Sequence, residues 1–262
     1  MRESSSPLAG LRQRIARLTT DGGTASRQAG YRLASGHADF DAALGGGLAT
    51  GRVHEFFSAD VLGGTSAAAF AALLALRSPG RGPLIWLRTA DAANRAGHIY
   101  APGIAELGGD PAQLLLIQAP DPKMLLASAY DAIRCGGSGG VVLESWGRFP
   151  HYDLTAGRRL ALGAREAGTT LLMLRLNAVP TPSVAETRWR VAAAASQALD
   201  ANAPGAPSFD LELLRWRAGP AGGRWRLDWN HDEHAFREPA LSGALLPLPA
   251  RRAARPRGAA AA

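Results

Sequence analysis

Three arginine–tryptophan–arginine triplets in the last third of the chain show the side-chain pattern best suited to binding. The triplets are Arg188-Trp189-Arg190, Arg215-Trp216-Arg217 and Arg224-Trp225-Arg226. Each lies in a β-prone run, where successive side chains point to opposite faces, so its tryptophan faces one way and both arginines the other. The arginine face would suit DNA phosphates or an acidic partner. The alternative, which we favour, packs the tryptophans into the core and leaves the arginines solvated.

The whole chain is basic, with a formal net charge of +7, and this favours an anionic partner. A proteome rich in arginine and alanine would produce the same bias. The basic residues are almost all arginine, and Lys123 is the only lysine. The C-terminal residues 241–262, which include Arg251 and Arg252, lack the periodicity of a packed element, so we expect a mobile basic tail that could contact nucleic acid or a partner.

The cysteine and histidine content argues against a metal centre. Cys135 is the only cysteine, which excludes an internal disulfide and a cysteine metal cluster. His231 and His234 come closest to a ligand pair, but a solvated turn is the expected structure there. The polar start of the chain predicts no signal peptide, and no apolar run is long enough to span a bilayer. We therefore expect a cytoplasmic protein without a membrane partner.

A glycine-rich stretch, residues 35–57, carries the most specific motif of the sequence. It contains Asp41, Leu44, the glycines 45–47, then Gly51-Arg52 and Glu55. In type and spacing these residues resemble the stretch that leads into the phosphate loop of RecA-family proteins. The resemblance implies a RecA-like core and places the phosphate loop at residues 58–66. We call residues 35–57 the approach segment.

The expected phosphate loop departs from the pattern G-x-x-x-x-G-K-[ST]. Ser58 replaces the first glycine and Gly63 keeps the last, while Thr65, followed by Ser66, stands at the magnesium-binding hydroxyl. Gly64 stands at the lysine. That lysine normally bridges the β- and γ-phosphates and balances the charge of phosphoryl transfer, which glycine cannot do. We therefore expect neither tight ATP binding nor hydrolysis.

The acidic half of the site is altered as well. Glu144 ends an apolar strand where RecA-like proteins usually have the magnesium-binding aspartate. The catalytic glutamate is expected after residues 84–87, where Asp91 is the nearest match and is shorter by one methylene. Arg88 is a candidate to replace the lost cation. We expect a non-catalytic protein without a cofactor. One alternative is that Gly63-Gly64 is merely a turn before a helix, whose N-terminus still offers a weak anion site.

Alternating apolar runs and helical stretches predict a mostly parallel sheet covered on both faces. We expect strands at 52–57, 84–87, 114–118, 141–143 and 169–176, with helices at 65–77, 92–107, 122–135 and 154–167. Further strands at 188–194, 209–216 and 225–229 predict an antiparallel extension. The fold class is thus α/β, a RecA-like core with C-terminal antiparallel strands and a separate N-terminal helix.

That helix is predicted from four apolar residues at helical spacing, Leu8, Leu11, Ile15 and Leu18. A Gly/Ser/Thr-rich linker separates it from the core, so the expected divisions are 1–30, 31–240 and 241–262. RecA-like recombinases pass such a helix to a neighbouring subunit. We hypothesise that this one docks on RecA or on another copy of the chain. Packing on its own domain is the alternative.

Within the RecA-like proteins, the chain resembles the ImuA family, also described as SulA-like and damage-inducible. The missing lysine, the N-terminal Leu/Arg helix and the strand around Arg188 and Trp189 carry this resemblance. It implies an accessory role in SOS mutagenesis and error-prone translesion DNA synthesis, with ImuB, RecA and an error-prone DnaE-type polymerase as partners. The loops that hold single-stranded DNA in RecA would correspond to residues 145–154 and 177–186, and both are short.

Three functions remain open from the sequence. The first is a non-catalytic adaptor that acts through contacts with ImuB and RecA, with DNA bound directly or through partners. The second is an active RecA-like DNA-dependent ATPase or recombinase. The third is a cell-division inhibitor of the SulA type.

Overall fold

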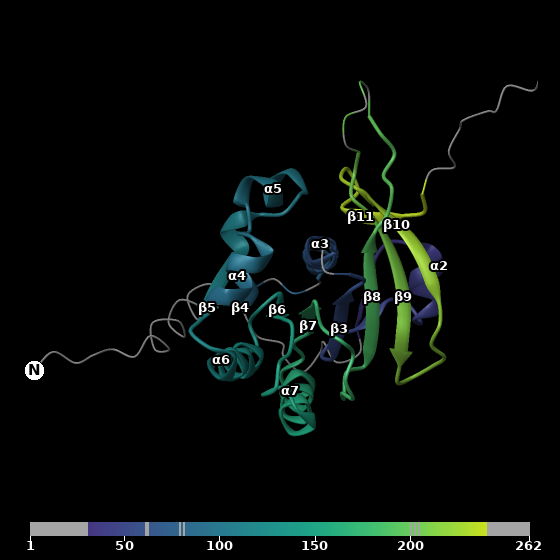
Figure 1. The fold of residues 1–262 in the computed structure, drawn as a ribbon. Coiled ribbons are helices and arrows are strands. Elements are labelled where there is room, and N and C mark those ends of the chain that lie inside the picture. The colour runs from purple at the N-terminus through teal and green to yellow at the C-terminus, as the bar shows by residue number, and fades with distance from the viewer. Residues whose placement is uncertain are drawn as a thin grey trace, which may run out of the picture.

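The computed structural model describes residues 31–239 apart from 61, 62, 79, 81, 200, 202 and 204. The described residues form a nine-stranded sheet with helices on both faces (Figure 1). Its strands are β3 (Val53–Ser58), β4 (Leu84–Thr89), β5 (Leu114–Ala119), β6 (Gly140–Trp146), β7 (Leu171–Leu176), β8 (Thr187–Ala193), β9 (Ser208–Trp216), β10 (Arg224–Asn230) and β11 (Ala235–Arg237). This is the mostly parallel, helix-flanked RecA-like architecture that the sequence predicts.

Several predicted features lie outside the described residues. They are the N-terminal helix with Leu8, Leu11, Ile15 and Leu18, and the basic tail with Arg251 and Arg252.

The strand order is β11-β10-β9-β8-β3-β7-β6-β4-β5. All pairings from β8 to β5 are parallel. The central strands β3, β6 and β7 are buried almost throughout, polar residues such as Glu55 and Arg175 included, because helices cover both of their faces. A separate two-stranded antiparallel pair joins β1 (Arg32–Leu33) to β2 (Leu48–Ala49).

The direction of β8 corrects one prediction. The sequence grouped all three C-terminal strands as an antiparallel extension, but β8 runs parallel to β3, and the antiparallel part begins at β9. Since β7 and β8 both run parallel to β3, the chain between them returns from the end of β7 to the end of the sheet where β3 begins. It passes β3 before β8 starts on the other side of that strand. No local pattern marks strand direction, because parallel and antiparallel strands share the same side-chain alternation.

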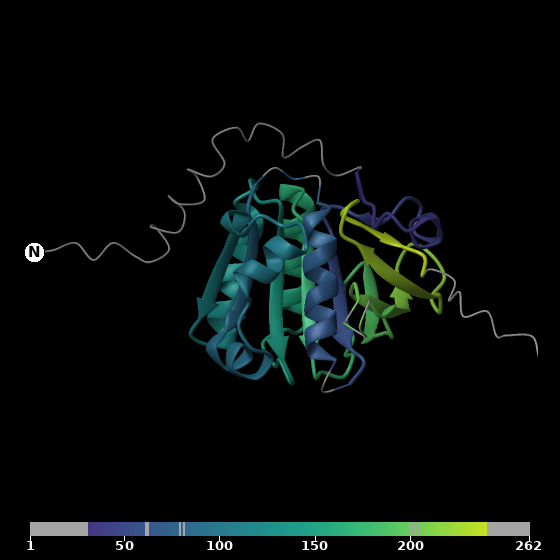
Figure 2. The same cartoon turned by 90° about the horizontal axis from the view of Figure 1, so that it is seen from above.

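Two helical layers cover the sheet. On one face lie α3 (Gly64–Leu76), α4 (Ala90–Ala96) and α5 (Ala101–Glu106), and on the other lie α6 (Pro122–Arg134) and α7 (Leu154–Ala167) (Figure 1). The short helix α2 (Ala38–Ala43) packs on the C-terminal strands, which lie beside α3 in Figure 2. A 3₁₀ turn spans Pro111–Gln113. Asp121 and Asp153 cap α6 and α7 by accepting backbone N–H bonds.

The single helix predicted at residues 92–107 is wrong, because the chain forms the two short helices α4 and α5 there. Gly97 follows α4 with φ +81°, a conformation that ends a helix, and Pro102 opens α5. No residue of α5 is buried. Ile99 and Leu107, on either side of α5, are only partly buried against the core.

The core divides into two clusters, one on each face of the sheet. Trp189 is fully buried in the α3-side cluster, where its ring lies 5.1 Å from Phe40 and 5.9 Å from Trp225 between centroids. Ile133 and Leu160 anchor the second cluster beneath α6 and α7. Among the described residues, no helix has the length and hydropathy needed to cross a bilayer.

Candidate functional site

The approach segment contains α2, β2 and most of β3, and the turns between these elements place the start of β3. Asp41 accepts backbone N–H bonds from Ser35 and Gly36 at 2.8 and 2.9 Å. Gly47 has φ +114°, and a Cβ there would lie 2.4 Å from the Leu33 carbonyl oxygen, so only glycine fits. The motif residues are therefore structural supports for the strand that carries the expected phosphate loop.

Asp60 and Ser58, two described residues of the expected phosphate loop, accept backbone N–H bonds. Asp60 Oδ1 accepts the backbone N–H of Gly63 at 2.6 Å. Ser58 Oγ accepts the backbone N–H of Asn177 at 3.0 Å. In a working phosphate loop, such N–H groups converge on the phosphates. Here the Asp60 carboxylate accepts the N–H of Gly63, the last glycine of the motif, and places negative charge where a phosphate would bind.

Gly64, at the lysine position, is buried against Trp146. A Cβ at position 64 would lie 3.3 Å from the Trp146 ring and 3.8 Å from Leu176. The ring at the end of β6 is thus in close contact with position 64, and a side chain there would require it to shift. Thr65, one residue on, is exposed, and Ser66 is half-buried.

The Glu144 carboxylate interacts with two other side chains of the protein. Its carboxylate is 1% exposed and accepts the Trp86 indole N–H at 2.8 Å. Arg88 lies 3.3 Å away as an ion-pair partner. Burial raises the pKa of Glu144, although Arg88 and Trp86 act against this rise. Both groups would compete with a cation for this carboxylate.

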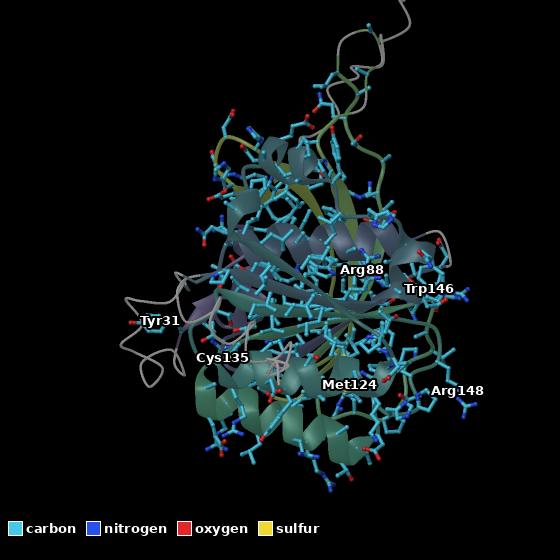
Figure 3. The ribbon with its side chains drawn as sticks, turned by 90° about the vertical axis from the view of Figure 1, so that its left-hand side faces the viewer. Tyr31, Arg88, Met124, Cys135, Trp146 and Arg148 are labelled. Carbon is cyan, nitrogen blue, oxygen red and sulfur yellow. The ribbon has the colours of Figure 1, made fainter. Side chains whose placement is uncertain are left out.

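Arg88 does not replace the missing lysine. Its guanidinium is buried, and it donates to the carbonyls of Ala92 and Gly97 at 3.2 and 2.7 Å besides pairing with Glu144. Asp91, the nearest match to the catalytic glutamate, is exposed and paired with Arg95 at 3.0 Å. Thr65, Arg88 and Glu144 do share one cavity of about 270 Å³. Figure 3 shows Arg88 and Trp146 on the same side of the molecule.

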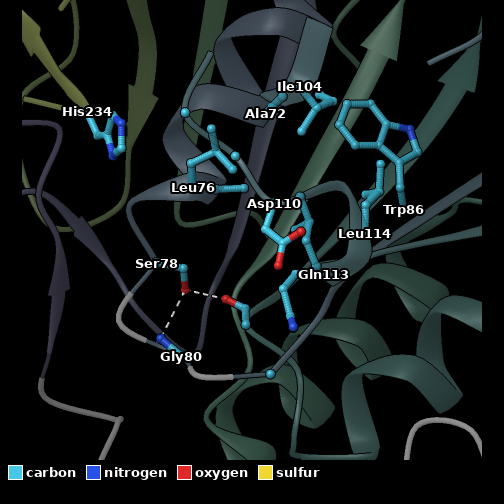
Figure 4. Close-up of a pocket in the computed structure, with 16 residues that line it drawn as sticks. Ala72, Leu76, Ser78, Gly80, Trp86, Ile104, Asp110, Gln113, Leu114 and His234 are labelled. Atoms are coloured by element: carbon cyan, nitrogen blue, oxygen red, sulfur yellow. Dashed lines mark hydrogen bonds between the residues drawn. The ribbon is translucent and has the colours of Figure 1, made fainter. Parts of the chain in front are cut away.

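A second cavity, of about 260 Å³, lies between the end of α3 and the loop after α5 (Figure 4). Trp86, Ala72 and Ile104 line both cavities. At its base, Ser78 donates to the Gly139 carbonyl. The described residues that line this cavity include no arginine or lysine.

In the C-terminal triplets the tryptophans lie on one face of the sheet and the arginines on the other, as the alternation predicts. Trp189, Trp216 and Trp225 all contribute to the α3-side cluster. On the other face, Arg190 and Arg224 both pair with Glu212, and Arg226 pairs with Asp210 through two bonds of 2.8 and 2.9 Å. These exposed arginines are neutralised by carboxylates of the neighbouring strand.

The other three arginines of the triplets have different surroundings. Arg188 is a correction to the sequence interpretation, because it is buried and pairs with Glu55 at 2.8 Å. Arg215 and Arg217 donate to the carbonyls of Ser183 and Val184. The six arginines therefore do not form one continuous binding face.

A buried polar cluster around Glu55 was missed from the sequence. Besides Arg188, Glu55 accepts the Tyr152 hydroxyl at 2.8 Å. The Arg175 guanidinium lies over the Tyr152 and Phe149 rings, 5.4 and 5.9 Å from their centroids. Burial raises the pKa of Tyr152 and lowers that of Arg175. Both aromatic residues of the loop that follows β6 are thus buried and not available to stack on bases.

His54 forms a second buried polar link at the start of β3. Its Nε2–H donates to the Ala49 carbonyl at 2.9 Å, and its Nδ1 accepts the Thr187 hydroxyl at 2.7 Å. Thr187 in turn accepts the Trp189 indole N–H. Burial lowers the pKa of His54 to about 4, because the imidazolium cannot be solvated there.

Comparison with known proteins gives two relatives. No family model matches the chain. Two curated proteins, both called Protein ImuA and from two strains of Caulobacter vibrioides (NA1000 / CB15N and ATCC 19089 / CIP 103742 / CB 15), are each 34% identical to it over 211 residues. The alignment covers 74% of this chain and 82% of each relative.

Proposed function

Because this chain belongs to the ImuA family, we propose that it is a non-catalytic, RecA-like adaptor of an error-prone translesion DNA synthesis complex. Membership of the family supports a role in damage-inducible mutagenesis. The adaptor mechanism is our proposal, and it assigns the work of the protein to surfaces that bind other proteins in the cytoplasm. The partners implied by the family resemblance are ImuB, RecA and an error-prone DnaE-type polymerase.

The observation that carries the proposal is the packing of Trp146 against Gly64. A missing lysine alone could be replaced by a cation from elsewhere, but a side chain at position 64 would also press on the Trp146 ring. The Asp60 carboxylate supports the same conclusion, because it holds the Gly63 N–H that a phosphate would need. Glu144 supports it again, because the ion pair with Arg88 competes with a metal. Each feature opposes a different step of ATP use, namely cation bridging, phosphate binding and magnesium binding.

The first experiment measures ATP turnover by the purified full chain, with and without single-stranded DNA, beside an active RecA protein as positive control. The expected result is turnover at the level of the buffer blank under both conditions. A turnover that depends on the chain and is stimulated by DNA would overturn the adaptor proposal in favour of an active recombinase.

The second experiment asks whether the chain joins the complex. Tagged chain and ImuB are co-expressed, and the expected result is co-purification at a fixed ratio that does not change when ATP is added or removed. A chain that neither hydrolyses ATP nor co-purifies with ImuB would leave the adaptor function without support. Blocked FtsZ polymerisation by the purified chain would favour the cell-division inhibitor instead.

A further inference from the structure

An arginine-lined cleft of about 580 Å³ lies between α7 and the start of β3, at the opposite end of that strand from the degenerate loop. Arg158 and Arg165 line it from α7, and Arg52 and Arg217 line it from the sheet. Glu186 is the one acidic residue among its described lining residues. This gives the cleft a marked positive charge.

Most of that charge is not neutralised by the described residues. Glu186 approaches Arg52 at 4.0 Å, at the limit of an ion pair. No carboxylate of the described residues forms an ion pair with Arg158, Arg165 or Arg217. The exposed arginines of β8 and β10 differ, because Glu212 and Asp210 neutralise Arg190, Arg224 and Arg226. Of these two basic surfaces, the cleft is the one that keeps its charge for a ligand.

The cleft also has an apolar floor. On α7, Gly157, Leu160 and Ala164 face the core, so the outward stripe runs through Arg158, Leu162 and Arg165 at helical spacing. Leu162 is 56% exposed although it lies between two arginines. Val53, Ala161 and Val184 extend this apolar lining. A ligand that fits must therefore supply negative charge and apolar surface together.

The two ends of this chain that lie outside the described residues do not have that chemistry. Residues 1–30 contain five arginines against two acidic residues, Glu3 and Asp21. Residues 240–262 contain four arginines and no acidic residue. Both ends would be repelled by the cleft. Charge complementarity therefore points to a segment of another protein.

We propose that this cleft binds an acidic peptide segment of a partner protein, with carboxylates on Arg158, Arg165 and Arg217 and an apolar side chain over Leu162. Guanidinium groups pair with carboxylates through two parallel N–H bonds, which gives such a site directional specificity. A nucleic acid would satisfy the arginines but leave the exposed Leu162 uncovered, so a peptide with an apolar side chain fits better. The proposal rests on the adaptor function and adds to it a surface and a ligand class.

The test uses the full chain and a short fluorescein-labelled peptide of alternating glutamate and leucine, followed by fluorescence anisotropy. Parallel probes replace glutamate with lysine, replace leucine with serine, or are a labelled oligothymidylate. The wild-type chain should prefer the glutamate–leucine peptide to all three. Arg165→Glu and, separately, Arg158→Glu should each weaken this binding about tenfold, because each opposes like charges. Leu162→Ser should weaken it severalfold.

Arg148→Glu is the matched control. It makes the same charge change on an exposed arginine near Trp146, on the side of the molecule opposite Tyr31 and Cys135 (Figure 3). Binding should change by no more than about twofold, the effect of an uninvolved surface charge. An equal loss in Arg148→Glu and Arg165→Glu would overturn the proposal, as would preference for the oligothymidylate or dimerisation of the chain through this face.

Failure of this proposal can be told apart from failure of the adaptor function. A chain that is inert towards ATP and co-purifies with ImuB, but shows no Arg165-dependent peptide binding, overturns the cleft alone. A chain that hydrolyses ATP and still binds the peptide through Arg165 overturns the adaptor function and keeps the cleft.

Discussion

Trp146 covers Gly64 so closely that a Cβ at position 64 would lie 3.3 Å from the indole ring. Because Trp146 ends β6, a side chain at position 64 would have to displace this ring or the end of that strand. We therefore expect that a lysine at position 64 alone does not restore a phosphate site.

Gly64→Lys should therefore fail to restore ATP turnover and should lower the free energy of unfolding by about 1–3 kcal/mol, as overpacking does. Chemical denaturation and a turnover assay measure the two effects. Thr65→Lys is the control, because it adds the same side chain at an exposed neighbouring position and should change stability little. If Gly64→Lys hydrolysed ATP and Thr65→Lys did not, the Trp146 ring would have moved aside and the loop would still bind phosphate.

Glu144→Gln should lower the free energy of unfolding by about 3 kcal/mol, because it leaves Arg88 buried without its ionic partner. The double variant Arg88→Met/Glu144→Gln should regain part of that loss, which urea denaturation of both variants would measure. The matched control is Asp91→Asn, which breaks the exposed pair with Arg95 and should cost under about 1 kcal/mol. Equal costs for the two acidic residues would mean that Glu144 is not a structural group.

His54 predicts a loss of stability in acid. Its pKa is lowered to about 4 in the folded chain from 6.5 in the unfolded chain, so the unfolded state binds more protons as the pH falls between these values. By pH 5 the contribution of His54 should have dropped by about 2 kcal/mol relative to neutral pH. Urea denaturation at both pH values should show a flatter response in His54→Gln. His98→Gln, at an exposed position, should leave the wild-type slope unchanged.

Tyr152→Phe should lower the free energy of unfolding by about 1–3 kcal/mol, because Glu55 loses a buried hydrogen-bond donor. Thermal or chemical denaturation measures the change. Tyr100→Phe removes the same hydroxyl from a side chain that is 69% exposed and should be close to neutral. If both variants behave alike, the cluster around Glu55 does not depend on its tyrosine.

Deletion of residues 1–25 tests the hypothesis for the N-terminal helix. If Leu8, Leu11, Ile15 and Leu18 dock on RecA, the shortened chain should fold but fail to retain RecA in a pull-down. Deletion of residues 241–262 is the parallel control and should retain it. Unchanged RecA binding by the chain that lacks residues 1–25 would reject the docking hypothesis.

The sequence by itself determined those features that depend on local patterns. The helix predicted at 154–167 coincides with α7, because its apolar spacing, Asp153 cap and closing Gly168 are all local signals. The alternation of strands and helices followed from the same kind of pattern, and so did the common face of the three tryptophans, while the RecA-like fold was implied by the resemblance of residues 35–57. The absence of lysine near position 64 needed no structure at all.

Tertiary structure decided what depends on residues far apart in the chain. It runs β8 parallel to β3, brings Trp146 onto Gly64, and turns Arg88 onto Glu144 instead of towards a phosphate. It also separates Arg188, buried on Glu55, from Arg190, exposed beside Glu212, although only Trp189 lies between them. Alternation places two such arginines on one face, but burial depends on which element covers each position. That is a property of long-range packing, for which a single sequence carries no local signal.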